Sequence, residues 1–437
     1  MYLEKYWNII LKNNFVKSFL ILISGSAAAQ IINFGFYPLL SRIYDSKDFG
    51  VLALFTSIIG ICSSFTSGKY ELAIPTVKEE AEARKIVKVA MFFSVSFAIL
   101  VALILFLIWS FFPNFQRELF QNNLVWLVPI SIILINGYEI FTYYYIRYGN
   151  LKIILRTKLY QAASKNIIQV GGGVLFLNKG MFLVLGLIMS QSTGLYSFVK
   201  KYFKGRKIRP FFERDSFRFQ KAEIFKYAQL YKKYPLFLIP SGFLNKLGIE
   251  LPVFFFTLYF GASFTGNYAM ANLVTLTPIS IIIQSLSKSY LNEFSVKYST
   301  SGEKALSFYN AFHLKLLKWT LLPCILLCFV IKPLALFALG AKWLLAAEMM
   351  QYLCALAYFQ LIYSTISQTL NVINRHEKQL TWNIIRTVFI LALFFIAHLI
   401  GMDNLLIFKI YILAMIVFYI ILGQITINTL KNHIKHG

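Results

Sequence analysis

A lysine interrupts an apolar stretch of the chain. Lys246 lies in FLIPSGFLNKLGIELPVF, with Asn245 beside it and Glu250 one helical turn later. An ionisable side chain inside a membrane helix costs about 2.5 to 3.5 kcal/mol on insertion scales, so it usually faces a water-filled cavity or a partner. We therefore predict that Lys246 and Asn245 contact an anionic substrate in a central cavity. The alternative is an ion pair between Lys246 and Glu250 at i, i+4 spacing.

Two other apolar segments also carry polar side chains. Lys165 and Gln169 lie in one of them, where Lys165 either lines the cavity or extends its amine to the cytoplasmic surface. Gln30 and Asn33 lie in the other, where they either line the cavity or hydrogen-bond one helix to another. We predict that all four belong to the substrate cavity, with these structural alternatives open.

One acidic residue outside the Lys246 segment lies deep in an apolar stretch. Glu139, in INGYEIFTYYYIRYG, either accepts a coupling proton or cation or balances the charge of a lysine in the cavity. Glu250 is a candidate for the same roles. The residues alone do not choose between coupling and charge balance.

The composition places these residues in a membrane protein. Apolar residues make up 58% of the chain and charged residues 14%, whereas soluble domains carry about 25% charged residues. The 43 Lys and Arg outnumber the 18 Asp and Glu, but they lie between apolar spans, which argues against nucleic-acid binding. The four cysteines lie inside apolar segments without other ligands at metal-binding spacing, so we expect neither disulfides nor a metal site.

Apolar windows long enough to cross a bilayer recur along the whole chain. A membrane helix needs about 20 mostly apolar residues, and on this criterion the sequence predicts an all-α membrane protein of about twelve transmembrane helices. The predicted helices are centred near Asn33, Gly60, Ala102, Leu134, Gln169, Gly186, Leu247, Thr275, Leu327, Phe359, Leu393 and Met415. The first, Ser18 to Ser41, is too long for a cleavable signal peptide.

Basic residues divide unevenly between the two sides of these helices. Most Lys and Arg fall in the two termini and the connections on the same side, which predicts that both termini are cytoplasmic. The opposite side holds Arg42, Lys47, Arg117, Lys179, Lys332, Lys342 and Lys409. A basic connection, 201–231, separates residues 1–200 from residues 232–437, and each half is predicted to form a six-helix lobe. This connection either lies on anionic lipid or is basic only because it is cytoplasmic.

The two predicted halves share a local pattern. Pro38, Tyr44, Phe49 and Gly50 have approximate counterparts in Pro252, Tyr259, Thr265 and Gly266. The offset between the members of each pair is nearly constant, about half the chain. Parallel repeats of this kind occur in several transporter folds, so the pattern indicates that the halves are related.

Two stretches resemble a known family. PLLSRIYDSKDFGVLALFTSI, from Pro38 to Ile58, and KYELAIPTVKEEAEA, from Lys69 to Ala83, are similar to signatures of the O-antigen and capsular polysaccharide flippases (Wzx-like). These proteins belong to the multidrug, oligosaccharidyl-lipid and polysaccharide (MOP) exporter superfamily. Lys69 stands where the family usually has arginine, so the positive charge remains. The segment from Thr277 to Ser295 is similar to the family's eighth-helix exit.

The resemblance implies both a fold and a function. The fold would be MATE-like, with two six-helix lobes around a cavity that the first and seventh helices line. The function would be to move an undecaprenyl-pyrophosphate-linked oligosaccharide, an O-antigen or capsule repeat unit, across the bacterial inner (cytoplasmic) membrane by alternating access. The implied partners are this lipid-linked oligosaccharide, membrane lipids and other polysaccharide-assembly proteins, without a cofactor. A pyrophosphate requires cations in a shielded site, which agrees with Lys246.

Two other functions compete with this interpretation. An ion-coupled multidrug exporter of the same superfamily would use deep acids, and Glu139 and Glu250 are available, although Lys165 and Lys246 offset their charge. A polysaccharide polymerase or ligase usually carries a large outer loop, and the predicted topology leaves no room for one. We therefore expect a transporter that is not an enzyme.

Overall fold

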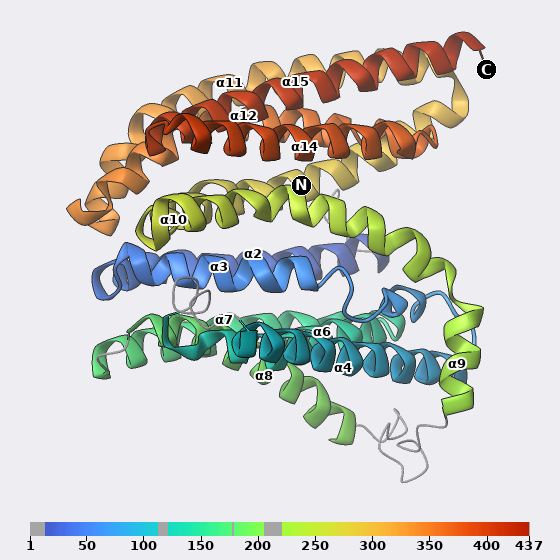
Figure 1. The fold of residues 1–437 in the computed structure, drawn as a ribbon. Helices are drawn as coiled ribbons and strands as arrows, with labels where there is room; N and C mark the ends of the chain where they lie inside the picture. The colour runs from blue at the N-terminus through green and yellow to red at the C-terminus, as the bar shows by residue number, and fades with distance from the viewer. Residues whose placement is uncertain (1–13, 112–120, 177–178, 205–220, 437) are drawn as a thin grey trace, which may run out of the picture. The chain divides into compact units, whose positions relative to one another are not determined.

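The computed structural model describes residues 14–111, 121–176, 179–204 and 221–436. All regular elements in these ranges are helices (Figure 1). The first half contains α2 (Asn14–Ile43), α3 (Ser46–Cys62), η1 (Tyr70–Ala73), α4 (Glu80–Phe111), η2 (Gln121–Trp126), α6 (Leu127–Arg147), α7 (Leu151–Leu175) and α8 (Lys179–Lys204). The second half contains α9 (Lys221–Leu230), α10 (Lys233–Thr300), α11 (Gly302–Leu339), η3 (Ala341–Trp343), α12 (Leu344–Ile366), α13 (Thr369–Val372), α14 (His376–Ile400) and α15 (Asn404–His436).

The prediction of an all-α membrane protein with about twelve long helices is confirmed. Every predicted centre lies in a helix, and α10 contains two of them. Within the described ranges, eight helices are long and apolar enough to cross a membrane. α3 falls short of the usual span because it has only 17 residues, and α7 has a low mean hydropathy because it carries Lys165, Asn166 and Gln169.

α10 consists of two helices joined at a single residue. Gly261 has φ 79° and ψ 171°, a conformation that lies outside the helical region and that glycine tolerates. The rings of Phe256 and Tyr268 lie on either side of it with centroids 5.0 Å apart. In one continuous helix, residues with that separation would be about 18 Å apart. The chain therefore reverses direction at Gly261, and the two parts of α10 are the predicted seventh and eighth helices.

The chain forms two compact units. The first comprises residues 1–44 and 51–246, and the second comprises residues 45–50 and 247–437. The division therefore falls within α10, and the short segment at the start of α3 groups with the second unit. The predicted six-helix lobes at 1–200 and 232–437 stay a prediction.

The first unit is built around α7, which packs most extensively against α8 and then against α2. α6 packs on α4 and α8, and the buried side chains of Phe55, Val128 and Val184 form an apolar cluster between these helices and α3. This packing fixes the faces of α2, α6 and α7 that carry the predicted polar residues.

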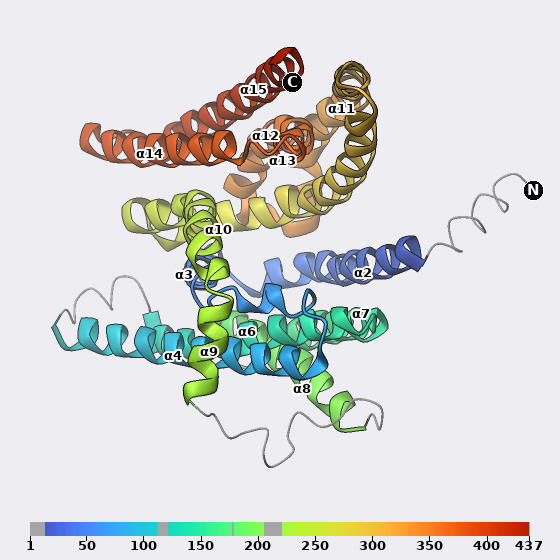
Figure 2. The ribbon, with the colours of Figure 1, turned by 90° about the vertical axis from the view of Figure 1, so that its right-hand side faces the viewer.

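The short helix α9, from the predicted basic connection, packs on the start of α4 (Figure 2). Lys85 Nζ lies 3.0 Å from a carboxylate oxygen of Glu223, and the Tyr231 hydroxyl donates to Glu82 Oε1 at 2.8 Å. Burial, followed by the hydrogen bond and charge of Glu82, raises the pKa of Tyr231. This part of the connection therefore contacts protein. Residues 205–220, on which the predicted lipid contact also depends, and Arg117 lie outside the described residues.

The second unit is built around α12, which packs on α11 and α15. Its buried face includes Met350, Leu353 and Cys354. All four cysteines of the chain are free, and the Cys324 thiol donates to the carbonyl oxygen of Cys354 at 3.3 Å. These contacts agree with cysteines that serve as packing residues.

Within the second unit, the start of α3 and the second part of α10 approach each other backbone to backbone. A Cβ added to Gly50 would overlap the carbonyl oxygen of Ala262, and a Cβ added to Gly266 would overlap the carbonyl oxygen of Ser46. The same sequence offset separates Gly50 from Gly266 and Ser46 from Ala262. The contact is therefore reciprocal, as a contact between two copies related by a two-fold axis would be.

Candidate functional site

In the loop between α3 and α4, a lysine has an unusual backbone conformation. Gly68 and Lys69 both have left-handed φ values, 63° and 58°, immediately before η1. A left-handed residue other than glycine costs about 1 to 3 kcal/mol, so the surrounding contacts must hold it in place. One of these contacts is the hydrogen bond from Lys69 Nζ to the Ser63 carbonyl oxygen, at 3.0 Å.

Side chains of α6 hold this loop in place through hydrogen bonds. The Arg147 guanidinium donates hydrogen bonds to the carbonyl oxygens of Ile74, Val77 and Lys78, the last at 2.8 Å. The Thr66 hydroxyl donates to Asn136 Oδ1 at 2.6 Å. A guanidinium offers several donors in a rigid plane, so one side chain satisfies three loop carbonyls at once.

A buried acid lies on the same loop. Glu71 is only 2% exposed, and the Ser67 hydroxyl donates to its carboxylate. Lys69, two residues earlier, is half-buried. The loop therefore presents one positive and one negative side chain to the inner part of the first unit.

Glu139 and Lys246 join these two residues. Glu139 lies on α6, and Glu71, Lys69 and Lys246 all interact electrostatically with its carboxylate. Lys246 comes from the part of α10 that belongs to the first unit. Glu139 thus has two cations, Lys69 and Lys246, and one acid, Glu71, as electrostatic neighbours, and we call these four residues the charge cluster. Asn245 is exposed on α10 beside the cluster.

The polar residues of α2 and α7 form a separate group. Asn166 Nδ2 donates to Asn33 Oδ1 at 2.9 Å, and Gln169 Nε2 donates to the Leu183 carbonyl of α8 at 2.8 Å. Gln30 is an electrostatic neighbour of the Tyr37 hydroxyl, and Lys165 is half-buried on α7. Asn33 and Gln169 thus join one helix to another in this structure, while their predicted role in the cavity remains a prediction.

This second group keeps unused hydrogen-bonding capacity. Gln30 Nε2, Asn166 Oδ1 and Gln169 Oε1 are buried and have no hydrogen-bond partner among the described residues. A buried polar atom without a partner costs about 1 to 3 kcal/mol. The interface between α2 and α7 is therefore a place where a polar ligand group or water would be stabilised.

Glu250, the last predicted site residue, lies in the second unit. It is half-buried on α10 and interacts electrostatically with the Tyr268 hydroxyl. Tyr411 is a further electrostatic neighbour of Tyr268, so Glu250 lies near a pair of tyrosines.

The second unit also buries a positively charged side chain. Arg386 on α14 is only 4% exposed, and its guanidinium carbon lies 4.6 Å from the centre of the Trp382 ring. Its Nε and Nη2 atoms have no hydrogen-bond partner among the described residues. Tyr411 and Tyr419 of α15 are its electrostatic neighbours. The depth of Arg386 could not be read from its position in α14, because the tyrosines that cover it come from another helix.

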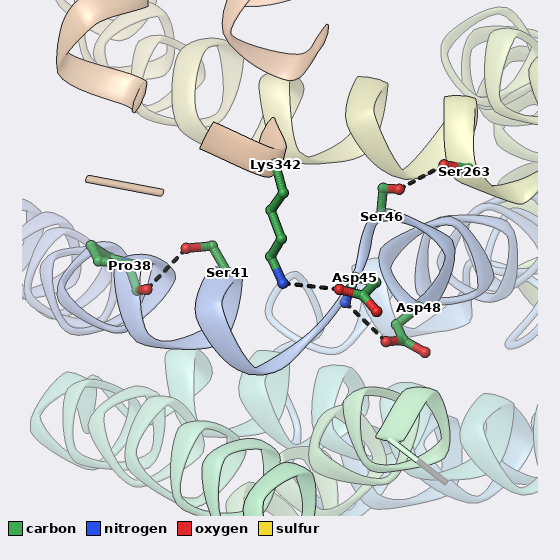
Figure 3. A network of polar contacts seen from close by, with 7 residues as sticks. All are labelled: Pro38, Ser41, Asp45, Ser46, Asp48, Ser263 and Lys342. Atoms are coloured by element: carbon green, nitrogen blue, oxygen red, sulfur yellow. Dashed lines mark hydrogen bonds and ion pairs between the residues drawn. The ribbon is translucent and has the colours of Figure 1, made fainter. Parts of the chain in front are cut away.

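The acids at the start of α3 have structural partners. Lys342 Nζ lies 2.9 Å from Asp45 Oδ1, and Asp48 Oδ2 accepts a hydrogen bond from the Asp45 amide at 3.0 Å (Figure 3). The second contact caps α3, because the Asp48 carboxylate reaches back to the residue before the helix. The Ser46 and Ser263 hydroxyls are 2.6 Å apart. Figure 3 also shows the Ser41 hydroxyl donating to the Pro38 carbonyl within α2, at 2.9 Å.

Comparisons with known proteins agree with this architecture. A family described as "Polysaccharide biosynthesis protein" matches residues 39–348. No curated protein matches the chain. Among solved structures, the chain is similar to an inward-facing multidrug resistance MATE family transporter of the MOP superfamily, with TM-score 0.67 and 14% identity, over 91% of this chain and 95% of the other.

Two further solved structures have the same fold. Lipid II flippase MurJ, in an inward closed conformation, matches with TM-score 0.60 and 17% identity, over 96% of this chain and 85% of the other. A MOP superfamily transporter from Pyrococcus furiosus matches with TM-score 0.54 and 13% identity, over 95% and 96%. At these identities the likeness establishes a MATE- and MurJ-like fold, which confirms the MATE-like fold that the family resemblance implies.

Proposed function

Because the chain belongs to the polysaccharide biosynthesis protein family, we propose that it is a flippase that moves a lipid-linked oligosaccharide across a membrane. The finer proposal is an undecaprenyl-pyrophosphate-linked O-antigen or capsule repeat unit, carried across the bacterial inner membrane by alternating access. A multi-pass membrane protein with a MOP-superfamily fold suits this task, since a flippase of the same fold is named for lipid II.

The observation that carries the proposal is the charge cluster of Lys69, Glu71, Glu139 and Lys246. Two cations inside a membrane protein can bind a pyrophosphate group through charge-assisted hydrogen bonds. The two acids keep the empty site neutral, which lowers the cost of holding lysines away from bulk water.

The cluster also supplies a way for the substrate to bind and leave. When a pyrophosphate enters, its oxygens become the partners of Lys246, which until then is balanced electrostatically by Glu139. When it leaves, Glu139 again balances the lysine. The step needs no covalent bond change and no cofactor, so the proposed activity is transport and not catalysis.

The unpartnered amide atoms of Gln30, Asn166 and Gln169 are proposed to contact hydroxyl groups of the carried sugar. Amide side chains offer both donors and acceptors, so they suit a sugar better than a second phosphate. Lys165, half-buried on α7 beside Asn166, adds a positive charge to this group.

A second candidate function is an ion-coupled multidrug exporter. The fold shared with a multidrug resistance MATE family transporter and the carboxylate of Glu139 favour it. In that case Glu139 would bind a proton or a cationic drug, and Lys246 would oppose the drug. The two functions therefore make opposite predictions for Lys246.

Complementation tests the proposal. The chain and its Lys246→Gln variant are expressed in a bacterium that lacks its own surface-polysaccharide flippase, and lipid-linked precursor is measured on each side of the membrane. A charged hydrogen bond contributes about 1.5 to 3 kcal/mol, so Lys246→Gln should reduce outward precursor at least about tenfold.

Two variants serve as controls at matched expression. Lys246→Arg keeps the charge and should retain most export, and Lys304→Gln changes an exposed lysine on α11 and should have no effect. If Lys246→Gln exports as well as the unchanged chain, the proposal that Lys246 binds the pyrophosphate is wrong. If it instead increases drug efflux, the multidrug exporter is the better interpretation.

A further inference from the structure

A cavity of about 730 Å³ opens between α14 and α15 in the second unit. The two helices meet near the turn at 401–403 and separate toward the C-terminus (Figure 1). The volume of the cavity falls within the range of about 300 to 1,000 Å³ that is usual for ligand sites. The cavity is lined by Arg375, Lys378, Thr381, Trp382, Ile385, Phe418, Ile421, Ile425, Asn428, Thr429, Asn432 and His433.

The lining changes from basic to apolar along the helices. Arg375 and Lys378 lie at the start of α14, and His433 lies near the end of α15, so all three are at the wide end. Ile385 and Phe418 lie farther in, toward the turn that joins the helices. The cavity is therefore amphipathic, with positive charge at its mouth.

The basic residues at the mouth are only partly neutralised. Arg375 lies 3.5 Å from Glu377 in an exposed ion pair, and the Tyr298 hydroxyl is 2.9 Å from His433 Nδ1. Lys378 is exposed, and within the described residues its side chain makes no hydrogen bond or ion pair. One carboxylate thus faces two permanent cations and a histidine.

A hydrogen bond joins the two helices at the inner wall, and a further positive charge lies behind Trp382. Trp382 Nε1 donates to the Phe418 carbonyl at 2.8 Å, which joins α14 to α15 at this point. The guanidinium of Arg386, one turn farther along α14, lies over the Trp382 ring and has two buried nitrogens without partners among the described residues. The charge of Arg386 makes the potential at the apolar end more favourable to an anionic ligand.

We infer that this cavity binds an anionic membrane phospholipid. Its phosphate contacts Arg375 and Lys378 at the mouth, and the upper part of one acyl chain lies along Ile385, Phe418 and Ile421. Basic pockets between transmembrane helices bind anionic lipid headgroups in this way. The predicted orientation places the mouth on the cytoplasmic side, where anionic headgroups are available. This site is distinct from the charge cluster of the first unit and goes beyond the proposed transport.

Quenching of tryptophan fluorescence by brominated lipid tests the inference. The full chain is reconstituted in phosphatidylcholine nanodiscs that contain either brominated phosphatidylglycerol or brominated phosphatidylcholine with the same acyl chains. The share due to Trp382 is the difference between the unchanged chain and Trp382→Phe. We expect phosphatidylglycerol to quench Trp382 strongly at contents where phosphatidylcholine has little effect.

Variants test the two parts of the site. Each of Arg375→Gln and Lys378→Gln should lower the affinity for phosphatidylglycerol about fivefold, the effect of one basic residue near the membrane surface. Ile421→Phe, which narrows the apolar end, should reduce quenching by either lipid. Lys431→Gln is the matched control, because Lys431 is exposed on α15 and does not line the cavity.

Three outcomes would overturn the inference. Equal quenching by the two brominated lipids would mean that the cavity holds lipid without regard to charge. Absence of quenching by both would mean that lipid does not enter. An effect of Lys431→Gln as large as that of Lys378→Gln would mean that general surface charge, and not this cavity, attracts the lipid.

Discussion

The segments 45–50 and 261–266 make reciprocal backbone contacts but are held in place by different contacts. Each contributes one glycine, Gly50 or Gly266, whose missing side chain lets the other segment approach. The first segment is held by charged side chains, with Asp45 on Lys342 and Asp48 on the Asp45 amide. The second depends on the turn at Gly261 and on the hydroxyl contact between Thr257 and Thr265, at 3.1 Å.

This difference separates the backbone contact, which the two segments share, from the polar contacts, which they do not share. The backbone contact is the same in both directions, so a change to either glycine affects both segments. The polar side chains around it differ between the two segments. The close contact at the two glycines should therefore matter far more to stability than the polar contacts that surround it.

The largest expected effect comes from adding one methyl group at either glycine. Gly50→Ala and Gly266→Ala each place a Cβ on a backbone carbonyl oxygen, and neither backbone can move without separating the segments. Each should destabilise the folded protein by about 3 kcal/mol or more, measured by denaturation of the purified protein.

The reciprocal contact also predicts how the two substitutions combine in a double variant. Once one substitution has separated the segments, the second should add little, so the double variant should be clearly less destabilised than the sum. Gly35→Ala is the control, because an added Cβ there has open space and helical alanine is favoured. Additive losses, or a loss with Gly35→Ala, would contradict a shared contact.

A smaller effect is expected at the helix cap. Asp48→Ala removes the carboxylate that accepts from the Asp45 amide, and the loss of such a cap costs about 1 kcal/mol. Asp48→Glu can still reach the amide and should restore most of the stability. If Asp48→Ala were as harmful as Gly50→Ala, the polar contacts would matter as much as the backbone approach.

The smallest effect is expected at the ion pair. Asp45 and Lys342 have side chains that are 76% and 41% exposed, and exposed pairs contribute about 0 to 1 kcal/mol. Lys342→Gln should therefore change the denaturation midpoint only slightly, and any change should shrink in high salt. A large, salt-independent loss would show that this pair is a main support of the segment.

The sequence predicted the long helices well because membrane spans are set by length and composition. Apolar windows on each side of Gly261 predict separate helices centred at Leu247 and Thr275, and these are the two helices that meet within α10. Glu139 is predicted either to accept a coupling proton or cation or to balance a lysine, and with Lys246 among its electrostatic neighbours both roles stay predictions.

Contacts between distant segments could not be predicted in the same way. The charges of Lys69 and Glu71 are visible in the KYELAIP stretch. Their place beside Glu139 depends on the hydrogen bonds that Arg147 donates to the loop carbonyls. Asn33 was recognised as polar, yet its partner Asn166 follows from the packing of α2 on α7. A helical pattern shows which residues are polar but not which helix each of them faces.

The reversal at Gly261 has a consequence for how the protein is made. The seventh and eighth helices are joined by one residue, so almost no chain is available to let the first enter the bilayer while the second waits outside. Each helix hydrogen-bonds its own backbone, and the Phe256 and Tyr268 rings already touch across the turn. These two helices should therefore leave the translocon together as a preformed hairpin. A mutation that stiffens the turn would then impair membrane insertion during synthesis before it affected transport.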